Sequence, residues 1–183
     1  MKTVIFAGGC FWCVEHDLRS LAGVTSVVSG YTGGTIVNPT YEQVIYEGSG
    51  HREAVEVIYD ETNISFKKLC QFFLDHIDPT DADGQFADRG NNYKTAIYFQ
   101  DEGEETVARA LLTELAESRV YEDKPIVVDV LPVQPFYSAE EEHQDYASKN
   151  PVHYGMYRVG SGREGFVNGV CQIREEKKIN WKD

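Results

Sequence analysis

The most constraining part of the sequence is residues 6–13, Phe-Ala-Gly-Gly-Cys-Phe-Trp-Cys, near its start. Residues 3–6 are apolar and largely β-branched, which predicts a buried strand, and apolar residues recur at helical spacing from Phe11 to Leu18. Cys10 is therefore expected at or near the first residue of a helix, after two glycines that permit a tight turn. There, free N–H groups and the positive end of the helix dipole favour a thiolate over a thiol. This stretch predicts a nucleophilic or redox-active cysteine.

Two less specific interpretations of the same stretch stay open. Cys10 could be a buried core cysteine, which is common for this residue type. Alternatively, Cys10 and Cys13 could form half of a zinc site. Cys70 and Cys171 are isolated in the sequence, and neither belongs to a second C-x-x-C or to an H-x-H pair. The sequence therefore favours thiol chemistry, and we expect Cys70 in the core, no metal and no bound cofactor.

Composition sets the class of protein. The chain has 183 residues, of which 42% are hydrophobic and 26% charged, so we expect one globular domain. The net charge of −13 argues against nucleic acid or an anionic membrane as a partner. The sequence contains no apolar run of roughly eighteen residues, and its first residues lead directly into the predicted strand, so we expect neither a transmembrane helix nor a signal peptide. The four cysteines do not resemble a secreted disulfide framework, and we expect a cytoplasmic monomer.

Hydrophobic periodicity predicts strands mixed with helices along the whole chain. The expected strands are residues 3–6, 23–31, 51–59, 95–99 and 126–131, with a short extended piece at 43–46. The expected helices are residues 11–18, 66–77, 102–118 and 139–147. We expect a long polar loop over residues 78–93, and a glycine-rich and then charged tail from about residue 155. This mixture predicts an α/β fold of the α+β two-layer sandwich type, in a single domain over residues 1–183.

Five groups of residues, in order along the chain, resemble the motifs of the methionine sulfoxide reductase A family. They are residues 8–12, residues 31–34 with 38–41, residues 50–55, residues 78–80 with Gln85 and 88–93, and residues 142–146 with 149–151. The resemblance implies a ferredoxin-like mixed sheet with packed helices. It also implies reduction of the S epimer of methionine sulfoxide, free or in proteins, through a cysteine sulfenic acid and an intramolecular disulfide. The final reductant that it implies is thioredoxin.

Sulfoxide reduction requires proton donors beside the nucleophile, because the oxygen must leave as water or hydroxide. Glu53 has apolar neighbours on its strand that predict partial burial, and burial would keep its carboxyl group protonated at neutral pH. Tyr41 and Tyr93 are neutral donors able to polarise the sulfoxide oxygen, and Asp88 could hold a water or orient the cysteine. The resemblance implies the same roles, with Cys10 as nucleophile, Glu53 as general acid and the other three residues around the oxygen.

The aromatic residues Phe11 and Trp12 are expected to hold the S-methyl group of the substrate. A second thiol must then clear the sulfenic acid on Cys10. We favour Cys13, because helical spacing places its Cα atom within disulfide range, whereas closing the loop from Cys171 costs more ordering entropy. The glycines before Cys171 could still let that residue swing in, and a relay through both cysteines stays open.

Two functions of other classes remain as alternatives. A C-x-x-C motif that follows a strand and opens a helix is also the pattern of a general thiol–disulfide oxidoreductase. That activity has no need for the acid and the tyrosines at the other motifs. The second alternative is a non-catalytic module that recognises oxidised or apolar side chains through Phe11 and Trp12. The sequence as a whole favours the reductase.

Overall fold

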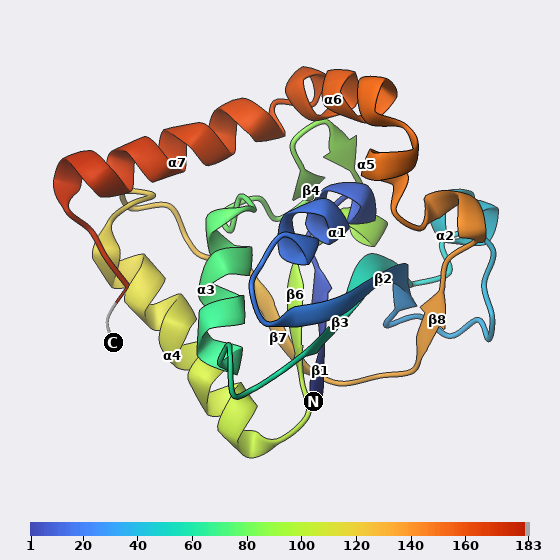
Figure 1. Cartoon of the computed structure of the whole chain (residues 1–183), viewed down its shortest axis with the longest axis horizontal. Helices are drawn as coiled ribbons and strands as arrows, with labels where there is room; N and C mark the ends of the chain where they lie inside the picture. The colour runs from blue at the N-terminus through green and yellow to red at the C-terminus, as the bar shows by residue number, and fades with distance from the viewer. Residues whose placement is uncertain (182–183) are drawn as a thin grey trace.

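In the computed structural model, which describes residues 1–181, a six-stranded sheet forms the centre of the fold (Figure 1). Its strands are β1 (Lys2–Ala7), β2 (Val24–Thr32), β3 (Arg52–Tyr59), β6 (Ala96–Phe99), β7 (Asp129–Pro132) and β8 (Phe136–Ser138). They lie in the order β7-β6-β1-β3-β2-β8, and β6 and β7 are parallel while the other neighbours are antiparallel.

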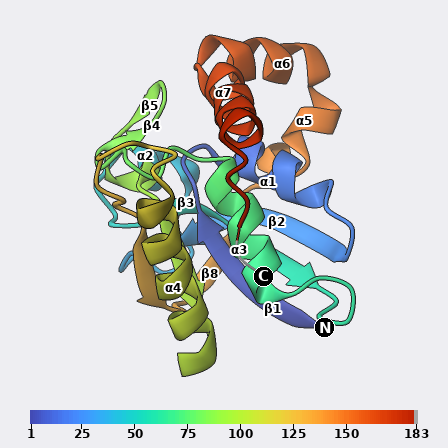
Figure 2. The same ribbon diagram turned by 90° about the vertical axis from the view of Figure 1, so that its left-hand side faces the viewer.

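The helices pack on this sheet and across one end of it. The longer ones are α1 (Phe11–Arg19), α3 (Phe66–Asp75), α4 (Glu102–Ser118), α6 (Pro151–Gly160) and α7 (Arg163–Lys177). The shorter elements are α2 (Tyr41–Tyr46), β4 (Gly84–Gln85), β5 (Asp88–Arg89), η1 (Asn91–Tyr93), η2 (Glu141–His143) and α5 (Tyr146–Lys149). Both views show α6 and α7 running above α1 and α3 (Figures 1 and 2). Within the described part of the chain, no helix is long and apolar enough to cross a membrane.

Strands β1, β2, β3 and β6, with α1 after β1 and α3 after β3, form the βαββαβ arrangement of a ferredoxin-like fold. The predicted ferredoxin-like mixed sheet with packed helices is therefore confirmed.

Strand β3 places its side chains alternately on the two faces of the sheet. Val55 packs with Phe6 in the larger core, beneath α1 and α3, whereas Ala54 belongs to a smaller cluster on the opposite face. β3 is hydrogen-bonded on both sides, with Val55 opposite Phe6 of β1 and Glu53 opposite Tyr31 of β2. Because side chains two residues apart share a face, Glu53 lies on the side of the sheet that α1 covers.

The turn between β1 and α1 requires its two glycines. A Cβ atom at Gly8 would lie 2.7 Å from the ring of Phe73. Gly9 has a φ of +82°, and a Cβ atom there would lie 2.5 Å from the side chain of Gln85. The turn delivers the chain to Cys10, which is the N-cap residue of α1. The predicted position of this cysteine at the start of a helix is confirmed.

Two predictions about the middle of the chain need correction. The extended piece predicted at residues 43–46 is wrong, since these residues belong to α2. That helix is started by a capping box, in which the Thr40 hydroxyl accepts from the Gln43 N–H and the Gln43 side chain accepts from the Thr40 N–H. The strand predicted over residues 126–131 begins only at Asp129, because the segment before it is hydrogen-bonded to a loop.

One prediction about the last third of the chain is wrong. The helix predicted over residues 139–147 is replaced by η2 and α5, because Asp145 between them has a left-handed backbone with a φ of 51°. The glycine-rich and then charged tail predicted from about residue 155 forms most of α6 and α7. Pro151 occupies the first turn of α6, where its missing N–H costs no hydrogen bond, and both helices bury apolar side chains.

Candidate active site

Cys10 lies at the start of α1 in a small cluster of sulfur and aromatic side chains. Its surface is 5% exposed. The cluster consists of Cys10, Cys13, Ala147 and Tyr154, with Trp12, Tyr146 and Tyr157 packed against it. In such a poorly hydrated environment hydrogen bonds and charges act more strongly than in water.

The thiols of Cys10 and Cys13 are joined by a hydrogen bond, so their protons are coupled. The pKa of Cys13 is lowered to about 7 because Cys10 donates to its sulfur and because Arg163 and Arg158 are positively charged, although burial acts in the opposite direction. Burial raises the pKa of Cys10 well above its ordinary value. The sequence predicts a thiolate on Cys10 from its place at the helix start, but burial outweighs that effect in the free enzyme. Near neutral pH the first thiolate of the pair is Cys13, and Cys10 keeps the shared proton.

Glu53 faces the first turn of α1 from β3. It is 2% exposed, and its Oε2 atom accepts a hydrogen bond from the Phe11 N–H at 3.0 Å. Burial raises the pKa of Glu53 to about 8, with a smaller contribution from the charge of Asp88, while the hydrogen bond from Phe11 opposes the shift. The predicted burial of this acid is confirmed, and burial shifts the pKa in the expected direction. A carboxylic acid that is neutral at pH 7 can give its proton to a leaving oxygen.

Two tyrosine hydroxyls adjoin Glu53. Tyr93, at the end of η1, is within hydrogen-bond reach of both Glu53 and Tyr41. Tyr41 begins α2, where its N–H donates to Glu140 at 2.8 Å and its ring stacks on His143. Burial raises the pKa of Tyr41 to about 12, and burial also raises the pKa of Tyr93. Both hydroxyls therefore stay protonated and can donate hydrogen bonds to a developing oxyanion.

Asp88, on β5, is connected to Cys10 through a residue of α6. The hydroxyl of Tyr157 donates to Oδ2 of Asp88, and the same hydroxyl is within hydrogen-bond reach of the Cys10 sulfur. Burial raises the pKa of Asp88. Asp88 is thus placed to orient the cysteine indirectly, and Tyr157 is a site residue that the sequence pattern does not predict.

The two aromatic residues after Cys10 have different surroundings. Phe11 is 1% exposed and packs in the core against Tyr31, with ring centroids 5.9 Å apart. Trp12 is partly exposed, stacks on Tyr146 with centroids 3.8 Å apart, and donates from Nε1 to His143 at 3.2 Å. Trp12 therefore keeps some exposed surface beside the cluster that contains Cys10, whereas Phe11 has little surface left for a substrate.

Arg163, the first residue of α7, is hydrogen-bonded to the turn that precedes Cys10. Its guanidinium donates to the Gly8 carbonyl at 2.7 Å and to the His76 carbonyl at 2.9 Å, and it lies over the Phe86 ring. The side chain is 1% exposed. The sequence pattern does not predict this buried arginine, because its partners lie far from it in the chain and arginines are rarely buried.

The structure separates the other two cysteines from this site. Cys70 is fully buried in α3, which confirms the prediction of a core residue. Cys171 is exposed on α7, eight residues after Arg163, which corresponds to about 12 Å along the helix axis. The glycines before Cys171 lie inside α7, so bringing its sulfur to Cys10 would require the helix to unwind.

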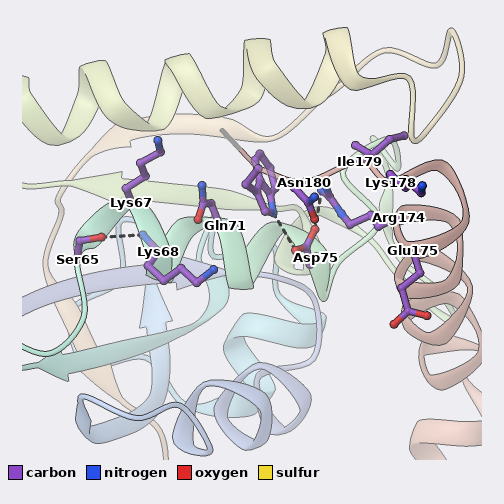
Figure 3. A pocket seen from close by; sticks show the side chains of 11 residues that line it. Ser65, Lys67, Lys68, Gln71, Asp75, Arg174, Glu175, Lys178, Ile179 and Asn180 are labelled. Carbon is purple, nitrogen blue, oxygen red and sulfur yellow. Dashed lines mark hydrogen bonds and ion pairs between the residues drawn. The ribbon is translucent and has the colours of Figure 1, made fainter. Parts of the chain in front are cut away.

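A hollow of about 730 Å³ lies elsewhere, between α3 and the end of α7 (Figure 3). Its walls are largely charged, with Lys67, Lys68, Asp75 and Arg174 among the residues that line it. Arg174 is already paired there with Asp75 at 2.7 Å. None of the residues around Cys10 lines this hollow.

The site thus brings together Cys10, Cys13, Glu53, Tyr41, Tyr93, Asp88 and Trp12, as the sequence predicts, and adds Tyr157 and Arg163. Coupled thiols, a protonated carboxylic acid and neutral hydroxyl donors define a thiol-dependent reductase. A family model described as "Peptide methionine sulfoxide reductase" matches residues 2–174. The chain belongs to the peptide methionine sulfoxide reductase family.

Relatives of known name and solved structure agree with this assignment. The chain is 51% identical to the peptide methionine sulfoxide reductase MsrA of Bacillus velezensis over 163 residues, which cover 89% of this chain and 92% of the relative. The structure resembles methionine sulfoxide reductase A of Corynebacterium diphtheriae, with a TM-score of 0.78, 31% identity, and coverage of 82% and 76% of the two chains. It also resembles Mxr1 of Saccharomyces cerevisiae in reduced form, with a TM-score of 0.77, 27% identity, and coverage of 82% and 86%. Mxr1 has also been solved in complex with Trx2.

Proposed function

We propose that this chain reduces the S epimer of methionine sulfoxide, free or within proteins, to methionine, with Cys10 as the nucleophile and Glu53 as the general acid. The observation that carries the assignment of roles is the buried, protonated Glu53 bound to the first turn of α1. Thiol–disulfide exchange does not need a buried acid beside its cysteine, whereas removal of an oxygen atom does.

The first step transfers the oxygen atom from the substrate to the enzyme. Cys10 passes its proton to the Cys13 thiolate while its sulfur attacks the sulfoxide sulfur. Glu53 protonates the oxygen, and Tyr41 and Tyr93 donate hydrogen bonds to it as charge develops. The protonated oxygen then moves to the Cys10 sulfur: an oxygen–Cys10 bond forms, while the bond from oxygen to the substrate sulfur and the bond between the two sulfurs break. Methionine leaves reduced by two electrons, and the oxygen stays on Cys10 as a sulfenic acid.

Two further features of the substrate are part of this proposal: where its S-methyl group binds, and which epimer at sulfur the enzyme reduces. The partly exposed ring of Trp12 suits the S-methyl group, because it is apolar and packs against the cluster that contains Cys10. One enzyme serves each sulfoxide epimer, and the A-type enzymes that this chain resembles act on the S form.

The second step forms a disulfide. Cys13 attacks the sulfur of the Cys10 sulfenic acid, the two sulfurs bond, and the oxygen leaves as water. Three residues of helix separate the two Cα atoms by about 5 Å, which is within the range of disulfides. The buried position of Cys13 beside Cys10, and the distance of Cys171 along α7, support Cys13 as the resolving thiol.

We infer that thioredoxin reduces this disulfide and returns the enzyme to its starting state. The complex of the relative Mxr1 with Trx2 supports this partner. A cytoplasmic location fits the same chemistry, because a reducing compartment keeps both the enzyme and its reductant in the thiol form.

The first test is turnover with dithiothreitol on a peptide that carries either the S or the R epimer. We expect the wild type to reduce the S epimer only, and Cys10→Ser to reduce neither. Mass mapping after one turnover without reductant is expected to find the Cys10–Cys13 disulfide. Reduction of neither epimer by the wild type would overturn the proposed reaction. A Cys10–Cys171 disulfide would overturn only the choice of Cys13.

A further inference from the structure

Tyr157 brings a hydroxyl group from α6 to the sulfur of Cys10. The hydroxyl is within hydrogen-bond reach of that sulfur, and it donates to Oδ2 of Asp88. Its ring packs at 80° against Trp12, with the ring centroids 5.9 Å apart. The helix and the ring contact therefore hold one hydroxyl group between a thiol and a carboxyl group.

This hydroxyl has a single proton and two neighbouring acceptors. In the free enzyme Cys10 holds its own proton, and Asp88 is the acceptor. When Cys10 gives up its proton to attack the substrate, its sulfur becomes a charged acceptor. Hydrogen bonds to charged acceptors are about twice as strong as bonds to neutral ones. The Cys10 sulfur then competes with the Asp88 carboxylate for this one proton, so the hydroxyl can turn from Asp88 to Cys10.

We propose that Tyr157 is a further catalytic residue, whose hydroxyl turns from Asp88 to the Cys10 sulfur and stabilises the thiolate during attack on the sulfoxide. This inference rests on the proposed function, since a sulfoxide reductase must form that thiolate inside a buried site. Burial raises the pKa of Tyr157 far above neutral, so the residue donates a hydrogen bond and releases no proton. Its role differs from that of Tyr41 and Tyr93, which adjoin Glu53.

Other titratable groups also act on the Cys10 sulfur, and a test must separate them from Tyr157. They are Cys13 of α1, Tyr41 of α2, Glu53 of β3 and Tyr93 of η1, while Asp88 of β5 is connected to the sulfur through Tyr157. Cys13 has the strongest coupling among them because it shares a proton with Cys10. A Cys13→Ala background removes that coupling and leaves the remaining groups in place.

The test is the pH dependence of Cys10 alkylation by iodoacetamide in the Cys13→Ala chain, followed by mass spectrometry of the peptide that contains Cys10. Tyr157→Phe keeps the ring on Trp12 and removes only the hydroxyl. We expect it to raise the midpoint of the alkylation profile by roughly one pH unit or more, as for loss of a hydrogen bond to a charged group. The matched control is Tyr121→Phe, because Tyr121 packs on Phe166 of α7 and its buried hydroxyl has no partner among the described residues. We expect no shift in the control.

A second variant tests the change of acceptor. Asp88→Asn removes the charged acceptor that competes for the hydroxyl, so it should lower the alkylation midpoint when Tyr157 is present and have a much smaller effect in Tyr157→Phe. An unchanged midpoint in Tyr157→Phe, or equal effects of Asp88→Asn in both backgrounds, would overturn the proposal. Alkylation needs no substrate, so this outcome is distinct from failure of the wild type to reduce a sulfoxide, which would overturn the proposed function instead.

Discussion

Cys10 and Cys13 are three residues apart and share a hydrogen bond, yet they differ in charge near neutral pH. Cys13 carries the thiolate because Cys10 donates to it and two arginines lie nearby, while burial keeps the proton on Cys10. This distribution lets Cys13 act twice. It accepts the proton of Cys10 in the first step and attacks the resulting sulfenic acid in the second.

The acid and the thiol pair predict a bell-shaped pH profile for the first chemical step. Below about pH 7 the Cys13 thiolate is protonated, and above about pH 8 Glu53 loses the proton that it must donate. The rate of a single turnover is therefore expected to fall on both sides of this range. Rapid-quench measurement of methionine formation across the range checks the profile.

The Glu53→Gln variant separates the two limbs of that profile. Glutamine keeps the shape of the side chain but has no acidic proton, so the rate at neutral pH should fall by roughly 10²- to 10⁴-fold. The limb near pH 8 should also disappear. Full activity of Glu53→Gln would favour a general thiol–disulfide oxidoreductase.

At the scale of elements, α7 stabilises the turn between β1 and α1 from a distant part of the chain. Arg163 donates to the carbonyls of Gly8 and His76, and its side chain is buried. The turn sets where Cys10 lies, so a helix remote in sequence contributes to the position of the nucleophile.

Replacing this arginine should destabilise the protein. Arg163→Met removes the partner of the buried Gly8 carbonyl and of the partly buried His76 carbonyl, and we expect a loss of roughly 2–4 kcal/mol in the free energy of unfolding. Urea denaturation measures the change. The matched control is Arg109→Met, which removes an exposed ion pair with Glu105 and should cost less than about 1 kcal/mol. Equal losses in the two variants would contradict the role given to Arg163.

Contacts between distant elements explain why the sequence predicts some site residues and misses others. Cys10 and Glu53 lie in short segments whose own periodicity places them, one at a helix start and the other on a buried strand face. Tyr157 and Arg163 depend on partners 69 and 155 residues away, and the sequence predicts no helix around them. Their helices are stabilised by packing on the rest of the fold, which local propensity does not contain.

At the scale of the whole molecule, the active site lowers the stability of the fold at alkaline pH. The pKa of Glu53 rises from 4.5 to about 8 on folding, so between these values the folded chain binds a proton that the unfolded chain does not. The free energy of unfolding therefore falls as the pH rises through this window and levels off above it. At the upper end of this pH window, the buried acid lowers the free energy of unfolding by on the order of a few kcal/mol.

The Glu53→Gln variant tests this cost. It should be more stable than the wild type at about pH 9, and the difference should shrink at about pH 4, where the acid is protonated in both states. Thermal unfolding at the two pH values measures the gap. A gap that does not change with pH would show that ionisation of Glu53 carries no such cost.

The pairing of β3 between β1 and β2 has a consequence for how the family can change. Moving β3 by one residue would turn Glu53 to the opposite face of the sheet and would have to break two ladders of hydrogen bonds at once. The separation between acid and cysteine is therefore determined by the sheet and does not depend on the connecting loops. Insertions and deletions in the loops that flank β3 can accumulate during evolution, and the catalytic pair stays at the same separation.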